Sequence, residues 1–434
     1  SFYLPELLAQ HWYYTSSTGD ILYRLSTYDF KTEESDESLI ADIWICYYKA
    51  IAQLNNILDF LDRSDAVFEY GNDKIIKGEA LGLRAFLHFE LFRIFGPSYS
   101  KDKESVCIPY AMTSETKVNP LLPAKEVARL IMEDLKGAED LLLGYDPVIE
   151  TGGAWGDEPD GGANDMRYRS MRLNYYAVQA LMARVALYCG EKDVAWEYAD
   201  KVIRGIHEGH EWFPFVTREE VVTADKEDRV YQSEIIFGLY NLKRKEGVYE
   251  IGFGANLKQG SVLRIDKEVM QDLYEGDDND YRLSYWFGEM VDPDNNSYPH
   301  VIKYMEVDDK DPKTEVSKGY RYIMPVIRVS EVYLIAAECC PDPKEGRDYL
   351  NAVRAARNVK NIPAEVDLIT SIEREYKREF VGEGQLFWLY KRKGKTEIAS
   401  GVKQGEAVAM EERFYLFDLP QSERDYRKEN DLKN

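Results

Sequence analysis

Cysteine and histidine are scarce in this sequence. Five of each occur in 434 residues, and Cys339 and Cys340 are neighbours, which fits no regular disulfide framework or zinc-binding spacing. The segment 207–210 reads His-Glu-Gly-His, but the helix of a zinc protease needs its two histidines four residues apart on one face. We therefore expect no metal site built from cysteine and histidine.

Long apolar runs and an excess of basic residues are also absent. A membrane-spanning helix needs a run of about 18 apolar residues, and the sequence contains none. Acidic residues outnumber basic ones, 78 against 55, for a net charge of −23, which argues against nucleic acid or an anionic membrane surface as the main partner. The first residue is Ser1, with no initiator Met, so we expect any targeting segment to lie upstream.

Motifs that would fix a catalytic centre are missing as well. There is no G-x-S-x-G elbow, and the Gly-Phe-Gly at 252–254 lacks the third glycine and the helix of a dinucleotide-binding loop. A glycoside hydrolase needs two carboxyl groups roughly 5 or 6.5–9.5 Å apart, and no motif fixes such a pair among the many acidic residues. We expect a non-catalytic protein, with a glycoside hydrolase on a helical scaffold as the enzymatic alternative.

Two acidic clusters are the remaining candidates for a metal site. They lie at 277–280 and 308–311, and their oxygen atoms suit calcium, but neither has the spacing of an EF-hand loop. We expect solvated acidic loops and no cofactor, and a structural calcium ion remains the alternative.

What the chain does contain is a series of apolar helices. The stretch 80–95 is apolar on almost every side, as a buried helix is, and its Arg84 and His88 share one face as polar groups with partners in the core. Helices at 173–188 and 194–206 form a hairpin of about 34 residues, the size of a tetratricopeptide unit. Those at 44–61 and 79–95 suggest a second hairpin, so the pattern predicts a mainly α protein with a few short strands.

Residues 210–320 differ from these helices in being irregular and rich in aromatic residues. Sugar C–H faces stack on aromatic rings, so this segment favours a sugar-binding protein over a helical-repeat protein that binds only protein partners. The leading candidate is Trp286, which lies at 281–287 where aromatics are denser than one strand face needs. The alternative is that Trp286 packs at the junction of the helical and irregular parts. Further candidates for ligand contact are Tyr298, Trp155, Tyr70 and Arg282, whose guanidinium offers a planar fork of donors.

Four segments of the sequence, taken in order, resemble one known family. They are EALGLRAFLHFELFRIFGP at 79–97, LNYYAVQALMARVALY at 173–188, PVIRVSEVYLIAAE at 325–338, and 379–392 together with Pro-Gln-Ser-Glu at 420–423. In their order and spacing they are similar to the SusD/RagB family, the surface nutrient-binding lipoproteins of Bacteroidetes polysaccharide-utilisation systems. Where that family usually has Arg and Asp in the last segment, this chain has Leu386 and Leu389, which implies a divergent branch without that salt bridge.

The resemblance implies a fold, a location and a partner. It implies a single domain over 1–434, with a scaffold of tetratricopeptide-like hairpins at about 1–209 and 321–434 and an irregular, ligand-binding insertion at about 210–320. It implies a lipid anchor on a cysteine upstream of Ser1 and a position at the cell surface on the outer membrane. The function implied is capture of a glycan or oligosaccharide and its delivery to a SusC-like TonB-dependent transporter.

Overall fold

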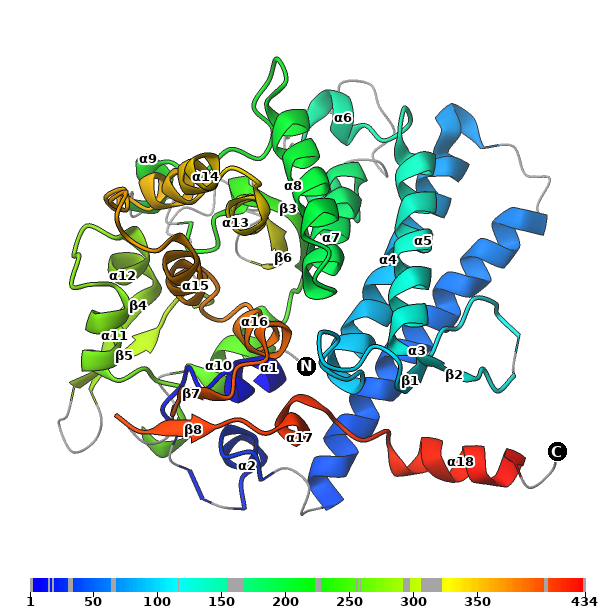
Figure 1. Cartoon of the computed structure of the whole chain (residues 1–434), viewed down its shortest axis with the longest axis horizontal. Coiled ribbons are helices and arrows are strands. Elements are labelled where there is room, and N and C mark those ends of the chain that lie inside the picture. Colours follow the sequence, from blue (N-terminus) through cyan, green and yellow to red (C-terminus); the bar gives the residue numbers. More distant parts are fainter. Residues whose placement is uncertain are drawn as a thin grey trace.

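The computed structural model is built mainly from helices, with short strands in four two-stranded antiparallel sheets (Figure 1). It describes residues 3–14, 16–17, 19–29, 34–63, 68–115, 117–153, 168–222, 228–254, 257, 259–291, 297–305, 322–401 and 405–431. Within these ranges, none of the helices combines the length and the hydrophobicity needed to cross a membrane. The mainly α fold predicted from the sequence is confirmed.

One half of the scaffold is a row of packed helices, in which α4 lies between α3 and α5, and α5 contacts the hairpin of α7 and α8 (Figure 1). The helix α4 is buried along most of its length, and two glycines allow its neighbours to approach. A Cβ at Gly78 would come within 2.8 Å of Leu142, and one at Gly82 within 2.5 Å of Leu173. The bounds of these helices are α3 Glu34–Arg63, α4 Asn72–Phe95, α5 Ala124–Leu142, α7 Tyr175–Tyr188 and α8 Lys192–His207.

The polar side chains of α4 have partners inside this row. Arg84 donates through Nε and Nη2 to the two carboxylate oxygens of Asp134, each at 2.7 Å. His88 Nε2 accepts the backbone N–H of Ala111 at 3.0 Å, so its Nδ1 carries the proton and donates to the Arg84 carbonyl at 2.9 Å. Both side chains are the satisfied core groups that the sequence predicts.

The other half of the scaffold continues the helical pairs with α13, which packs on α8, α14 and α15. The N-terminus of α15 is capped by Asp367, whose carboxylate accepts the backbone N–H of Thr370. The departures Leu386 and Leu389 are both buried on α16. The bounds are α13 Val329–Cys339, α14 Pro343–Ala356, α15 Leu368–Glu379 and α16 Leu386–Lys393.

The segment 210–320 is tied to this scaffold by a sheet. Its strand β3 pairs antiparallel with β6 at the start of the second helical half, with Ile235 opposite Arg328. A second hairpin, β4 with β5, follows α12 directly. The elements are α9 Arg218–Val222, η4 Gln232–Glu234, β3 Ile235–Tyr240, η5 Lys245–Tyr249, α10 Glu250–Gly252, η6 Gln259–Ser261, α11 Lys267–Leu273, α12 Tyr281–Trp286, β4 Phe287–Val291, β5 Ser297–Val301 and β6 Ile323–Arg328.

Buried ion pairs join the same two regions. Arg357 and Arg328 both donate to Glu379 at 2.5 Å and to Glu234, which precedes β3, at 2.6 and 3.2 Å. All four side chains are fully buried, and the two guanidinium groups hold the pKa of Glu379 well below its usual value against the opposing effect of burial. Removing one partner of such a network leaves an uncompensated buried charge, so the network fixes the segment on the scaffold.

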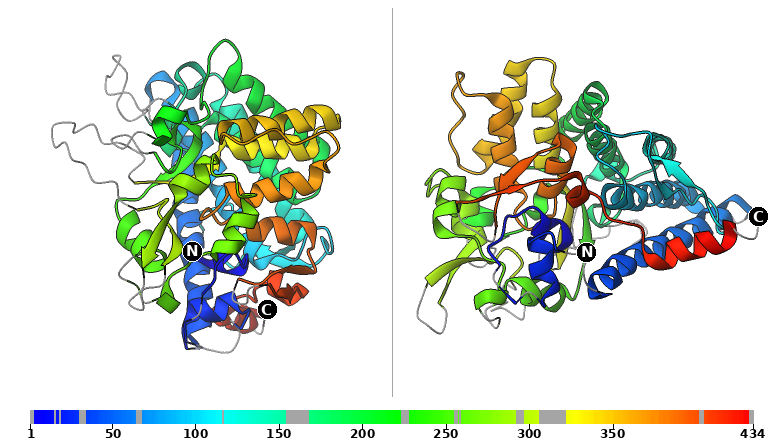
Figure 2. Two further views of the ribbon diagram at one scale, coloured as in Figure 1. Left: turned by 90° about the vertical axis from the view of Figure 1, so that its left-hand side faces the viewer. Right: turned by 60° about the horizontal axis from the view of Figure 1, so that its bottom comes forward.

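The remaining elements are short and lie around these two halves. The N-terminal helix α1 packs on α16, and the C-terminal helix α18 lies along α3 (Figure 2). Their bounds are α1 Tyr3–Leu8, α2 Ile21–Ser26, η1 Glu69–Gly71, β1 Val106–Pro109, β2 Leu121–Pro123, α6 Val148–Thr151, η3 Arg169–Met171, β7 Glu397–Ala399, β8 Ala407–Ala409, α17 Glu412–Tyr415 and α18 Gln421–Asp431.

Candidate ligand-binding surface

The leading candidate from the sequence, Trp286, lies in the interior. Its side chain is 0% exposed, the Lys303 ammonium lies 3.8 Å from the centre of the ring, and the Tyr231 ring lies 5.1 Å away. The expectation that Trp286 is a platform for a sugar therefore does not hold in this structure. Its position at the end of α12, against the ion-pair network, fits the alternative of a junction residue.

Arg282 is corrected for the same reason. Its guanidinium is fully buried and donates to Asp280 at 2.8 Å, to Glu375 at 2.5 Å and to Glu379 at 2.9 Å. These three carboxylates occupy the guanidinium donors that were expected to bind a ligand. Arg282 therefore belongs to the buried network.

The other three candidates differ in their exposure to solvent. Tyr298 is buried, with its hydroxyl 2.9 Å from the sulfur of Met290 and its ring under the Arg264 guanidinium at 5.1 Å. Trp155 lies outside the described residues. Tyr70 is 87% exposed, so it is the described candidate that presents a ring to solvent.

Tyr70 stands at the entrance to α4 in an unusual backbone conformation. Its φ is +55° and that of Gly71 is +75°, a region that residues other than glycine rarely adopt. Gly71 is needed there, because a Cβ would come within 2.3 Å of the Tyr145 ring. Tyr145 follows α5 and is itself exposed, so the left-handed turn places Tyr70 beside a second exposed tyrosine.

A second group of tyrosines surrounds the end of β3. Tyr240 is 42% exposed, and its ring centre lies 5.4 Å from that of Tyr322, which precedes β6. Tyr168 is exposed at the start of η3, which packs on β3. Burial raises the pKa of Tyr240, and the phenol groups of Tyr322 and Tyr168 raise it further.

A buried ion pair connects the two groups. Arg169, next to Tyr168, donates through Nε and Nη2 to Asp146, next to Tyr145, with both distances 2.8 Å. Arg169 also donates to Glu79 of α4. The helix α6 follows Asp146 and lies near the C-terminal end of α5 (Figure 1). We call the resulting set the tyrosine surface, and its members are Tyr70, Tyr145, Tyr168, Tyr240 and Tyr322.

Comparison with known proteins decides the family. The model of the SusD family matches residues 160–430, and a model described as "Starch-binding associating with outer membrane" matches residues 3–144. The chain belongs to the SusD family. No curated protein matches the sequence.

Solved structures show that the SusD fold extends over the whole chain. A SusD superfamily protein from Bacteroides thetaiotaomicron is 22% identical with a TM-score of 0.73, and the match covers 98% of this chain and 96% of that one. A SusD-like carbohydrate binding protein from Bacteroides vulgatus is 20% identical with a TM-score of 0.71, and the match covers 98% of this chain and 90% of that one. Surface glycan-binding protein A from Bacteroides uniformis is 16% identical with a TM-score of 0.71, and the match covers 99% of this chain and 92% of that one.

Two buried carboxyl groups of this SusD protein accept hydrogen bonds from the backbone. Burial raises the pKa of Glu6 and of Asp228 to about 7. Glu6 accepts from Trp12 Nε1 and from the backbone N–H of Gly384, and Asp228 accepts from the backbone N–H groups of 230 and 232. Both side chains are buried in backbone turns, so each one serves as a structural acceptor.

Metal ligands do not gather among the described residues. No group of three His, Cys, Asp or Glu side chains suited to a metal ion occurs in those ranges. In the cluster 277–280, Asp280 caps α12 and pairs with Arg282, while Asp277 accepts from Asn279. The cluster 308–311 lies outside the described residues.

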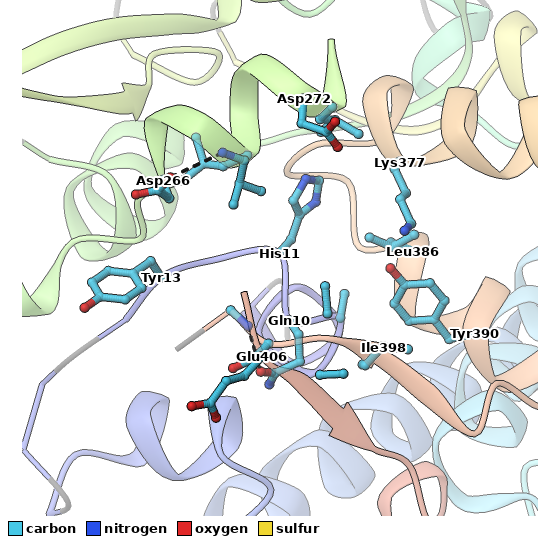
Figure 3. A pocket seen from close by; sticks show the side chains of 18 of the residues that line it. Gln10, His11, Tyr13, Asp266, Asp272, Lys377, Leu386, Tyr390, Ile398 and Glu406 are labelled. Atoms are coloured by element: carbon cyan, nitrogen blue, oxygen red, sulfur yellow. Dashed lines mark hydrogen bonds between the residues drawn. The ribbon is translucent and has the colours of Figure 1, made fainter. Parts of the chain in front are cut away.

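A large cavity lies elsewhere on the SusD scaffold. It has a volume of about 880 Å³ and is enclosed by α11, α15, α16, the hairpin of β7 and β8, and residues 9–13 (Figure 3). None of the five tyrosines of the tyrosine surface lines it. The cavity is thus separate from the tyrosine surface.

Proposed function

We propose that this SusD-family protein is a non-catalytic glycan-binding protein of the cell surface and that the tyrosine surface holds the sugar. The observation that carries the proposal is a group of four exposed tyrosines and the half-buried Tyr322, on elements that buried ion pairs and a sheet hold in place. Tyr70 and Tyr240 are the residues we expect to contribute most, because one has the most exposed ring and the other lies within a cluster of three.

The chemistry of tyrosine suits this role. A tyrosine ring offers a flat apolar face to sugar C–H groups, and its hydroxyl can donate to or accept from sugar hydroxyls. A rigid support reduces the entropy lost on binding, and Arg169 and Asp146 provide one beneath Tyr145 and Tyr168. Two of the structurally similar proteins, a SusD-like carbohydrate binding protein and a surface glycan-binding protein, support the same ligand class.

The absence of catalysis is the second part of the proposal. A glycosidase needs a carboxylic acid with a raised pKa beside its substrate, whereas Glu6 and Asp228 are enclosed by backbone donors. Incubation of the purified protein with a panel of polysaccharides, read as released reducing sugar, should give no more than the blank. Release that persists through repurification would favour the hydrolase alternative.

The third part concerns location and partner. We propose that a lipid anchor upstream of Ser1 holds the protein on the outer membrane and that it delivers glycan to a SusC-like TonB-dependent transporter. Membership of the SusD family supports this location. The family model that matches residues 3–144, described as "Starch-binding associating with outer membrane", supports it as well. The lipidated protein, extracted in mild detergent, should bring down a protein of transporter size, and its recovery alone would count against delivery.

The experiment that tests the glycan proposal is a glycan array probed with the purified protein. The expected result is a set of related glycans bound by the wild type and lost from a Tyr70→Ala, Tyr240→Ala double variant with unchanged melting temperature. Binding of protein ligands only, with no glycan retained, would favour the helical-repeat alternative.

A further inference from the structure

The cavity enclosed by α11, α15 and α16 has the size and the walls of a small-molecule site. Its volume of about 880 Å³ falls within the roughly 300–1,000 Å³ of ligand pockets. Its apolar walls come from buried side chains on three elements, namely Leu273 of α11, Leu386 of α16 and Ile398 of β7. The β7–β8 hairpin that lines it lies at the other side of the molecule from α6 (Figure 1), and none of the five tyrosines of the tyrosine surface lines the cavity.

Three polar groups from different parts of the chain line this space. They are the imidazole of His11 in the N-terminal segment, the ammonium of Lys377 on α15 and the hydroxyl of Tyr390 on α16 (Figure 3). The Lys377 Nζ lies 5.7 Å from the centre of the Tyr390 ring. Among the described residues, none of the three groups has a hydrogen-bond or ion-pair partner, although Tyr390 is buried and the other two are half-buried.

The carboxylates near Lys377 are already paired with other cations. Glu373, one turn earlier on α15, lies 3.1 Å from the Lys393 Nζ and 2.7 Å from the Lys395 Nζ. Asp272 of α11 pairs with Arg374 at 3.8 Å. Among the described residues that line this space, Lys377 is therefore the lysine or arginine without an ion pair.

The other acidic groups of the lining are engaged elsewhere or stand at the edge. Asp266 caps α11 by accepting the backbone N–H groups of Glu268 and Val269. Glu268 of α11, Glu397 of β7 and Glu406, which precedes β8, are exposed. The lining carboxylates are thus either exposed or held by other partners, as Glu373 is by Lys393 and Lys395.

The local electrostatics agree with this division. Burial lowers the pKa of Lys377, and the charges of Lys395 and Arg374 lower it further, while Glu373 and Asp272 oppose the shift. Burial, with the charge of Lys377, lowers the pKa of His11 to about 4. A group that is desolvated and surrounded by cations favours an anion as its partner.

We propose that this cavity is a second ligand site, which binds an acidic sugar through its carboxylate. The Lys377 ammonium and the Tyr390 hydroxyl donate to the carboxylate oxygens, which gives charge-assisted hydrogen bonds in a partly desolvated space. His11 donates its ring N–H to the same ligand, and Leu386 and Ile398 cover the apolar face of the sugar ring. The site shares no residue with the tyrosine surface, so it stands or falls independently of the proposed function.

Saturation-transfer NMR with the purified protein tests this inference, with D-glucuronate as the probe and D-glucose and succinate as comparisons. D-Glucuronate should bind at least tenfold more tightly than either, because glucose lacks the carboxylate and succinate lacks the ring. Lys377→Met should weaken glucuronate binding at least tenfold and Tyr390→Phe severalfold. Lys377 makes no ion pair with the described residues, and Tyr390→Phe keeps the ring, so neither variant should melt at a lower temperature.

Controls separate this site from other effects. Lys344→Met, which removes an exposed lysine of α14 outside the cavity, and Tyr240→Ala on the tyrosine surface should both leave glucuronate binding unchanged. The inference is overturned if glucose or succinate binds as well as glucuronate, if no probe binds, or if binding survives Lys377→Met. Loss of glucuronate binding in Tyr240→Ala would also overturn it, since the acidic sugar would then occupy the tyrosine surface.

Discussion

The ammonium of Lys303 lies 3.8 Å from the centre of the Trp286 ring, and both side chains are fully buried. Lys303 also donates to the Glu383 carboxylate at 2.5 Å and to the Val381 carbonyl at 3.2 Å. Trp286 therefore covers one end of the ion-pair network that holds the segment 210–320 on the helices. A ring in this position contributes packing energy, and a ligand has no access to it.

The first prediction concerns the stability of a Trp286→Ala variant. Removal of a fully buried tryptophan should lower the free energy of unfolding by about 3–5 kcal/mol, and here the loss also uncovers the Lys303 charge. Tyr70→Ala, a change at an 87% exposed ring, should alter it by less than about 0.5 kcal/mol. Urea unfolding of both variants measures the difference, and equal stabilities would contradict the assignment of Trp286 to the interior.

The second prediction concerns Arg282 and its three carboxylate partners. Arg282→Met leaves Asp280, Glu375 and Glu379 short of a counter-ion in the interior, so it should cost about 3–5 kcal/mol. Arg374→Met is the matched control, because Arg374 makes long ion pairs on the exposed side of α15 and should cost at most about 1 kcal/mol. Chemical unfolding measures the free energy of unfolding of both variants. A small effect of Arg282→Met would mean that the network contributes little to stability.

The third prediction concerns the charge state of His88. Burial, together with the charge of Arg84, lowers its pKa to about 3, although the Arg84 carbonyl opposes the shift. As the pH falls from about 6.5 towards 3, the unfolded chain takes up a proton that the folded chain does not, so this residue lowers stability by at most about 1.4 kcal/mol per pH unit. Above pH 6.5 its effect vanishes.

NMR titration of the imidazole groups measures this directly. The His88 ring should keep constant shifts from pH 7.5 to about 4.5, with the proton on Nδ1, because Nε2 accepts from Ala111. A His88 signal that titrates near its ordinary value would contradict the buried, neutral ring.

The sequence was informative where apolar periodicity decides structure. The helices α4, α7 and α13 and the mainly α class follow from apolar patterns within about 20 residues of chain. The sequence was less informative about Trp286, because a cluster of aromatics gives the same local pattern whether the rings face solvent or the core. Only contacts with Lys303 and Tyr231, distant in the chain, place it inside.

The tyrosine surface is a second feature that local sequence patterns do not reveal. Tyr145, Tyr168, Tyr240 and Tyr322 each stand alone at the end of an element, where no periodic pattern marks them. The pairing of β3 with β6 and the Asp146–Arg169 ion pair bring them together. Tyr70 and Tyr168 also have a positive φ, which no sequence pattern predicts.

The last prediction, and the most direct test of glycan binding at the tyrosine surface, is calorimetric titration of the best glycan from the array. Wild-type protein is compared with Tyr70→Ala, with Tyr240→Ala and with Tyr426→Ala, which removes an exposed tyrosine of α18. The account predicts that Tyr70→Ala and Tyr240→Ala each weaken the Kd at least tenfold, about 1.4 kcal/mol, at unchanged melting temperature, and that Tyr426→Ala binds as the wild type does. Wild-type affinity in both Tyr70→Ala and Tyr240→Ala would contradict it.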